Sequence, residues 1–223
     1  MKQPFTVMTK DSRRSKGFTL IEMMVVVAMI ALIVAAVAPM VFGTLISTRL
    51  SSAGETLAGQ ISLAHQIAVS RNMTVEVRFY EYDDPEAPGS GSAVRAVAIM
   101  QASETGQTSQ MGKQLTDTYY LPSGIAVGSS TSMSPLLATS AVRSEADREK
   151  IIKRSPNARY KAFQIRGDGS TNIEQIMRKE YMPNKSYITL AEDRAIGDGQ
   201  NVPKNFYAVQ IDPVTGRTTS YRP

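Results

Sequence analysis

The sequence predicts an α+β protein in which one long N-terminal helix packs on an antiparallel β-sheet. Two observations predict the helix: 26 uncharged residues run from Met23 to Thr48, and apolar residues then recur at steps of three or four as far as Ala68. A third observation predicts the sheet, because short segments after Asn72 alternate apolar and polar residues, which is the period of a β-strand.

The uncharged stretch is long enough to cross a bilayer, since about 20 apolar helical residues span the hydrocarbon core. Five basic residues precede it and the next lies at Arg49, so the positive-inside rule keeps the N-terminus in the cytoplasm and exports the remaining chain. These five are Lys2, Lys10, Arg13, Arg14 and Lys16. They carry most of the net charge of +5, and the nearly neutral remainder disfavours a broad nucleic-acid surface.

Two ordinary explanations of this stretch are a removable signal peptide and an uncleaved anchor. Ala36-Val37-Ala38 resembles a small-residue cleavage site, but Pro39 directly after it would hinder the peptidase. An uncleaved anchor accounts for the hydrophobicity and leaves Glu22 without a purpose. A carboxylate in a span costs roughly 2.5 to 3.5 kcal/mol on insertion scales, so Glu22 is a candidate functional residue.

The amphipathic part of the helix follows the uncharged stretch. We expect one continuous helix from about Phe18 to Ser70, whose buried stripe comprises Ile46, Leu50, Ala53, Leu57, Ile61, Ala64 and Ala68. Three glycines lower the helical propensity and permit bending or close packing, at positions 43, 54 and 59. His65 falls beside the stripe, which predicts a surface or boundary position.

Strands are predicted from the alternation that begins after Asn72. Val75, Val77 and Phe79 share one face of a half-buried strand over 74–82, with charged residues on the other face. Residues 83–92 predict a loop, and 93–101 its hairpin partner. Further strands are predicted at 116–121, 124–127, 160–166, 187–191, 206–212 and 218–221. The Ser/Thr-rich and then charged residues 128–158 predict a loop insertion with one short exposed helix.

Composition and motifs argue against an enzyme or a metal protein. The chain has no cysteine and one histidine, which excludes thiolate sites and imidazole clusters, and the common catalytic motifs are absent. Asp168, Ser170, Asn172 and Glu174 alternate like the opening of a calcium loop but lack its glycine and its final glutamate, so we expect a turn there. No catalytic residue, metal or cofactor is therefore predicted.

The segment Lys16-Gly17-Phe18-Thr19-Leu20-Ile21-Glu22, followed by the apolar run, resembles the prepilin signature of type IV pilins and type II secretion pseudopilins. The resemblance implies a pilin-like fold and a prepilin peptidase that cuts between Gly17 and Phe18 and methylates the new amino group of Phe18. It implies a leader over 1–17, a transmembrane helix over 18–42 and an extracytoplasmic (periplasmic) α+β domain over 43–223. Glu22 then becomes the assembly contact with a neighbouring subunit, and Pro39 a helix kink.

Later motifs resemble H-type pseudopilins and their FimT-like relatives. They are the segments 163–170, 187–190 and 211–217, of which Asp168-Gly169 and the turn before Arg217 are also ordinary hairpin turns. The whole chain further resembles the pseudopilin group called Verru_Chthon cassette protein D.

The function that these resemblances imply is a minor pilin or pseudopilin subunit of a type II secretion or type IV pilus-like assembly in the inner membrane. Its partners would be the prepilin peptidase and other subunits. One alternative is a FimT-like minor pilin that binds DNA for uptake through Arg217 and Arg222, although Thr218 and Thr219 stand where that reading needs a second arginine. Arg159, Lys161 and Arg166 are expected on a nearby strand. A weaker alternative is a membrane-anchored exported hydrolase.

Overall fold

The computed structural model describes residues 17–84, 91–102, 112–144, 151–152, 155, 158–178, 183–196 and 201–223. The chain divides into two units, Met1–Thr44 and Leu45–Pro223. Helix α1, Leu20–Arg71, begins in the first unit and ends in the second. Its ends lie within two residues of the predicted ones, which confirms the long helix.

The part of α1 in the first unit exposes its apolar side chains. Every large apolar residue from Phe18 to Val34 is at least 45% exposed, and Leu20 reaches 78%. Over the residues that the structure describes, no helix combines the length and apolar character that crossing a membrane requires. The side chains of residues 37–42, which include Pro39, lie outside the described part, so the kink at Pro39 stays a prediction.

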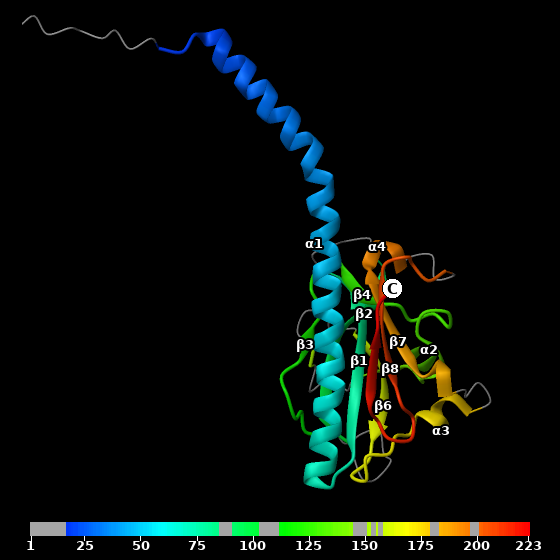
Figure 1. The fold of residues 1–223 in the computed structure, drawn as a ribbon. Coiled ribbons are helices and arrows are strands. Elements are labelled where there is room, and N and C mark those ends of the chain that lie inside the picture. The colour runs from blue at the N-terminus through cyan, green and yellow to red at the C-terminus, as the bar shows by residue number, and fades with distance from the viewer. Residues whose placement is uncertain are drawn as a thin grey trace, which may run out of the picture. The chain divides into compact units, whose positions relative to one another are not determined.

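Nine strands of the described residues form one antiparallel sheet in the second unit (Figure 1). The order is β5-β6-β1-β2-β4-β7-β8-β9, with β3 paired to β2 beside this path. The strands are β1 Val75–Asp83, β2 Ser92–Gln101, β3 Tyr119–Tyr120, β4 Ile125–Val127, β5 Arg143–Ser144, β6 Arg159–Ile165, β7 Tyr187–Glu192, β8 Phe206–Ile211 and β9 Thr218–Tyr221. The predicted β1–β2 hairpin is confirmed, with Val77 opposite Ile99.

The main core lies between α1 and one face of this sheet. Leu50, Leu57 and Ile61 of the predicted stripe are completely buried, and across from the helix Phe79 and Phe163 place their ring centroids 6.0 Å apart. Six of the seven predicted stripe residues are buried and the seventh, Ile46, is partly buried against the same core. The recurrence of apolar residues with a period of 3.6 therefore predicted the packed face of the helix correctly.

The other face of β1 is buried as well, so the prediction of a half-buried strand was wrong. A second apolar cluster covers it, comprising Tyr80, Tyr82, Ala96, Ala98, Met100, Ile152 and Tyr160. The charged residues of this face, Glu76 and Arg78, are 4% and 7% exposed and pair with each other. A buried charge is tolerated when it is paired and hydrogen-bonded, and alternation alone cannot reveal that partner.

The described part of residues 128–158 is more than an exposed loop, whereas most of its charged part lies outside the described residues, so the short exposed helix stays a prediction. Helix α2, Pro135–Thr139, buries Leu136 and Leu137 completely in the main core, and β5 joins the edge of the sheet. Three further short helices were not predicted: α3 Ile173–Met177, η2 Pro183–Lys185 and α4 Asp193–Ile196. The predicted strand over 116–121 shortens to β3. Short helices carry too few turns for a periodic signal.

Candidate functional site

The two predicted cleavage residues lie immediately before α1. Gly17 is exposed, and a Cβ added to it would meet no atom within 4 Å. Phe18 is 75% exposed and also precedes the helix. The described surroundings are therefore open, as a peptidase substrate requires. The remaining leader, residues 1–16, lies outside the described residues, so cleavage itself stays a prediction.

Glu22 makes a capping box with Thr19. The Thr19 backbone N–H and hydroxyl both donate to Glu22 Oε2 at 3.1 Å, and the Glu22 N–H donates to Thr19 Oγ1 at 3.3 Å. Because α1 begins at Leu20, Thr19 is the N-cap and Glu22 the third helical residue, which are the positions this motif uses. The spacing T-x-x-E is a local sequence signal of a capping box, although the box was not predicted.

This box gives Glu22 a local role besides the predicted assembly role. Its carboxylate is exposed, and it lies at the helix N-terminus, where the helix dipole favours negative charge. A glutamine could still complete the hydrogen bonds of a capping box, whereas the charge would be lost. The two roles of Glu22 are therefore separable by substitution.

The two predicted hairpin turns close with Asx-type hydrogen bonds. Asp168 Oδ1 accepts from the Ser170 N–H at 2.8 Å, and Asp212 Oδ1 accepts from the N–H groups of Val214 and Thr215 at 2.8 and 3.0 Å. Bonds from the Ser170 hydroxyl and N–H lower the pKa of Asp168, and the Thr215 and Val214 N–H groups lower the pKa of Asp212. Asp168 thus serves a turn, as predicted, and the described residues contain no cluster able to hold a metal.

Both turns meet α1 at His65. A Cβ on Gly169 would lie 3.0 Å from His65 Nε2, and one on Gly216 would lie 2.8 Å from His65 Cδ2. The φ values are +84° at Gly169 and +67° at Gly216, a region that residues other than glycine rarely adopt. Limited space and backbone conformation therefore both favour glycine at these positions. Thr171 Oγ1 donates to the Pro213 carbonyl at 2.5 Å and joins the turns. The half-buried His65 therefore has the predicted boundary position.

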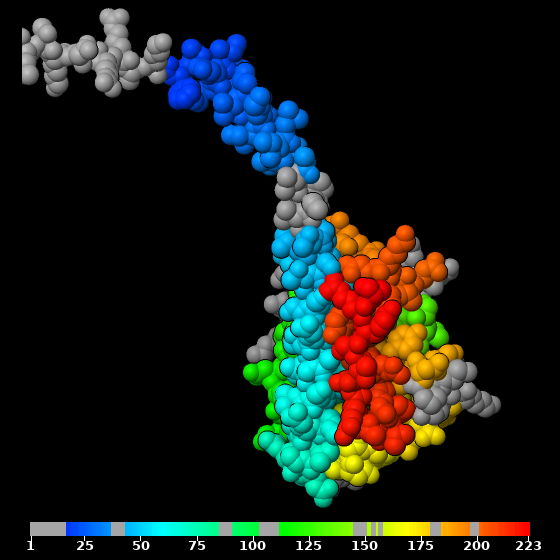
Figure 2. All heavy atoms as spheres, in the orientation of Figure 1, coloured from blue at the N-terminus to red at the C-terminus, as the bar shows by residue number. Residues whose placement is uncertain are grey.

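The possible DNA contacts are placed differently from one another. Arg217 is exposed, whereas Arg222 donates through Nη2 to the Ser47 carbonyl at 3.0 Å and also contacts Ser47 Oγ. The hydroxyls of Ser62 and Thr218 are 3.0 Å apart. Figure 2 shows the C-terminal strand in red along the cyan part of α1. Arg222 thus ties the chain end to the helix.

The strand expected to add basic residues near Arg217 is elsewhere in the sheet. Five strands, β1, β2, β4, β7 and β8, separate β6 from β9, so the predicted neighbourhood was wrong for Arg159 and Lys161, whereas Arg166 follows β6 and lies at the turn that Thr171 joins to Pro213. On β6, Lys161 is 7% exposed, and burial lowers the pKa of its ammonium group. Arg166 donates instead to Ser170 Oγ and the Thr171 carbonyl.

Comparison with known proteins identifies the N-terminal segment. Residues 12–38 match the family model of the prokaryotic N-terminal methylation motif. The fold is similar to the crystal structure of the type IV minor pilin FimU of Pseudomonas aeruginosa strain PAO1, at 10% identity and a TM-score of 0.39, over 79% of this chain and 93% of FimU. A second crystal form of FimU is 11% identical with a TM-score of 0.36, over 78% of this chain and 97% of FimU. No curated protein matches the sequence.

The matched motif covers the predicted cleavage residues, the capping box and the apolar start of α1. It indicates membrane anchoring through the N-terminal helix. The same helix packs on the antiparallel sheet in the second unit, which is the pilin-like arrangement that the sequence predicted. The chain therefore carries the prokaryotic N-terminal methylation motif over residues 12–38, which runs into a helix that packs on an antiparallel sheet.

Proposed function

We propose that the chain is a minor subunit of a type II secretion or type IV pilus-like assembly. A prepilin peptidase cuts it between Gly17 and Phe18 and methylates the new amino group of Phe18. The observation that carries this proposal is the methylation motif over residues 12–38, which brackets that bond. Cleavage there removes 17 of 223 residues and starts the mature chain one residue before the capping box.

The proposed topology follows from the distribution of charge and exposure. Residues 18–42 anchor the chain in the inner membrane with the N-terminus cytoplasmic, and residues 43–223 form the extracytoplasmic (periplasmic) domain. The exposed apolar side chains from Phe18 to Val34 support this, because such a surface requires a lipid or protein cover. Basic residues on the leader side support the orientation.

Glu22 is proposed as the contact that draws subunits together. A lone carboxylate in a low-dielectric medium is costly, and the methylated amino group of a neighbouring Phe18 would offset that cost. The Glu22 carboxylate is exposed at the start of the helix, where Thr19 donates to it, so a neighbouring subunit can reach it. The DNA-uptake alternative gains no support from Arg222, whose guanidinium binds Ser47.

Mass spectrometry of the mature N-terminus tests this function. We expect N-methyl-phenylalanine at Phe18 in cells that contain the peptidase, and an intact 223-residue precursor for Gly17→Leu. Gly43→Leu is the matched control, since a Cβ at either glycine meets no atom within 4 Å. A mature chain starting at Pro39, or an intact Met1 in the wild type, would contradict the proposal.

A further inference from the structure

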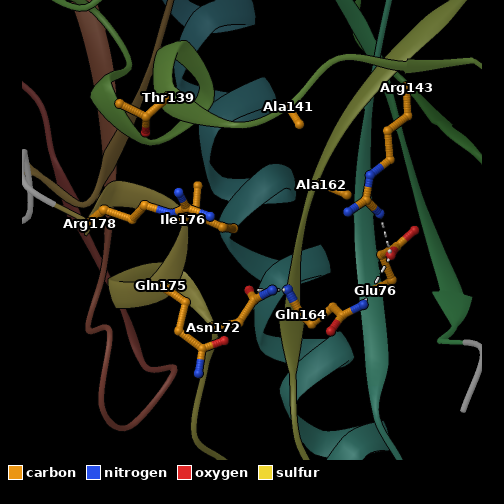
Figure 3. A pocket seen from close by; sticks show the side chains of 10 residues that line it. All are labelled: Glu76, Thr139, Ala141, Arg143, Ala162, Gln164, Asn172, Gln175, Ile176 and Arg178. Carbon is orange, nitrogen blue, oxygen red and sulfur yellow. Dashed lines mark hydrogen bonds and ion pairs between the residues drawn. The ribbon is translucent and has the colours of Figure 1, made fainter. Parts of the chain in front are cut away.

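A pocket of about 390 Å³, lined by both polar and apolar side chains, lies in the second unit on the sheet face opposite α1 (Figure 3). Glu76 of β1 and Gln164 of β6 form its floor, and they alternate with residues whose side chains pack towards the helix. Strand β5 contributes Arg143, and α3 contributes Gln175 together with the residues just before and after it, Asn172 and Arg178. The lining thus comes from segments far apart in the sequence.

Among the described lining residues, Glu76 supplies the one carboxylate, and it is already paired. Glu76 Oε1 accepts from Arg78 Nε at 2.6 Å, and its Oε2 accepts from Gln164 Nε2 at 3.2 Å and from Arg143 at 3.3 Å. Burial, the largest single effect, lowers the pKa of Arg78, but Glu76, Tyr160 and Tyr80 together outweigh it and the pKa is raised. Arg78 also stacks over the Tyr160 ring at 4.4 Å. Arg78 and Glu76 therefore form a closed buried pair.

Two further guanidinium groups reach the cavity. Arg143 touches Glu76 through one nitrogen only, and its side chain is 42% exposed. Arg178 is exposed, and no side-chain partner for it occurs among the described residues. In Figure 3 these two side chains extend towards the hollow from opposite sides. With Arg78 counted, three cations among the described residues surround the Glu76 carboxylate, an excess of two positive charges over the described side chains.

Neutral polar side chains also line the pocket, beside the apolar Ala141, Ala162 and Ile176. Asn172 Oδ1 accepts from the Gln164 backbone N–H at 2.7 Å, which leaves its amide NH₂ as the group available to a ligand. Gln175 is exposed on α3 beside it. The backbone of Arg178 has φ +45° and ψ −112°, a conformation that residues other than glycine rarely adopt. Its N–H donates to the Glu174 carbonyl, so the start of this side chain is fixed.

We propose that this cavity binds a carboxylate group of a polypeptide partner between Arg143 and Arg178. Guanidinium groups bind planar carboxylates through two parallel hydrogen bonds, and amide donors add to such a site. A singly charged group suits it better than a phosphate dianion, because the Glu76 carboxylate lies in the floor. The ligand is an acidic side chain or a chain terminus. The site does not depend on leader processing or on Glu22.

Peptide binding to the full chain in detergent tests the site. The probes are acetyl-Ala-Ala-Glu-Ala-amide, its Gln counterpart, and acetyl-tetra-alanine with a free C-terminus, measured by isothermal titration calorimetry. We expect the Glu peptide or the free C-terminus to bind, and the Gln peptide to bind at least tenfold more weakly. Which of the first two binds tighter identifies the source of the carboxylate.

Substitutions then locate the binding. Arg178→Gln should weaken it about 10- to 100-fold, because a charge-assisted contact is lost. Arg178→Gly removes the same group and relieves the positive φ, so it tests the site in a chain that folds at least as well. Arg194→Gln, an exposed arginine on α4 outside the cavity lining, is the matched control. The proposal would be overturned if the Glu and Gln peptides bound equally, or if no peptide bound at millimolar concentration. It would also be overturned if Arg178→Gly left binding unchanged, or if inorganic phosphate displaced the peptide more readily than acetate did.

Discussion

The two parts of helix α1 bury their apolar residues differently. Before Gly43, apolar residues surround the helix, and each large one described from Phe18 to Val34 is at least 45% exposed. After Gly43, a stripe of apolar residues packs on the sheet, and Leu50 and Leu57 are fully buried there. A helix that is apolar all round needs a cover from outside its own domain, whereas a stripe is covered by the domain itself. The first part therefore serves contacts beyond the chain and the second serves folding.

The largest expected contrast comes from matched leucine truncations in the two parts. Leu57→Ala should lower the free energy of unfolding by about 2 to 5 kcal/mol, because it leaves a cavity in the main core. Leu32→Ala, at a residue 72% exposed, should change it by no more than about 0.5 kcal/mol. Near-UV circular dichroism of the tyrosines, followed through chemical unfolding of the full chain in detergent, measures both. Equal losses would contradict the division of roles.

The glycines of the second part give a smaller contrast. A Cβ on Gly54 would lie 2.2 Å from Tyr207 Cδ1, and Tyr207 is only 6% exposed. Gly54→Ala should therefore destabilise the protein by about 1 to 3 kcal/mol through overpacking. Gly59→Ala, where no atom lies within 4 Å of the new Cβ, should stabilise it by about 0.5 to 1 kcal/mol through helical propensity. The same unfolding assay decides; a stabilised Gly54→Ala would show that Tyr207 moves aside freely.

These cases show what the sequence could predict. The buried stripe was predictable because its period depends on one helix and one face. The close contact of Gly54 with Tyr207 was not, because it joins residues 153 positions apart, and the sequence analysis could only name close packing as one of two options.

The candidate sites divide in the same way. The capping box of Thr19 and Glu22 is local and was readable, although it was missed. The burial of Glu76 depends on Arg143 and Gln164, which are 67 and 88 residues away, and strand alternation alone predicted an exposed face. A buried ion pair or a cavity assembled from distant segments leaves no pattern in the local sequence, whereas a capping box leaves a short motif.

Glu22 tests the outward role of the first part. Glu22→Gln can keep the capping box and removes the charge, whereas Glu22→Val removes both. We expect both variants to be cleaved and to lose crosslinking and co-purification with partner subunits. Only the Val variant should fray the helix start, by about 0.5 to 2 kcal/mol, seen as faster amide hydrogen exchange over residues 20–23. If the Gln variant assembles like the wild type, charge pairing is the wrong mechanism.

The smallest expected effect separates the structural role of the C-terminus from DNA capture. Arg222 binds Ser47 in the second part of α1, so Arg222→Ala should lower the free energy of unfolding by about 0.5 to 1.5 kcal/mol. Exposed Arg217 is the matched control, and Arg217→Ala should leave stability unchanged.

For DNA, we expect the full chain in detergent to shift duplex DNA only within the non-specific range, with a Kd of about 10⁻⁴ to 10⁻⁶ M at physiological salt. Neither substitution should alter that affinity, because one guanidinium is bound to the helix and the other stands apart from the basic residues of β6. Gel shifts at two salt concentrations measure this. Submicromolar binding that Arg217→Ala and Arg222→Ala abolish would make DNA capture the function of the second unit, because loss of a tie to α1 cannot by itself remove phosphate contacts made by Arg217.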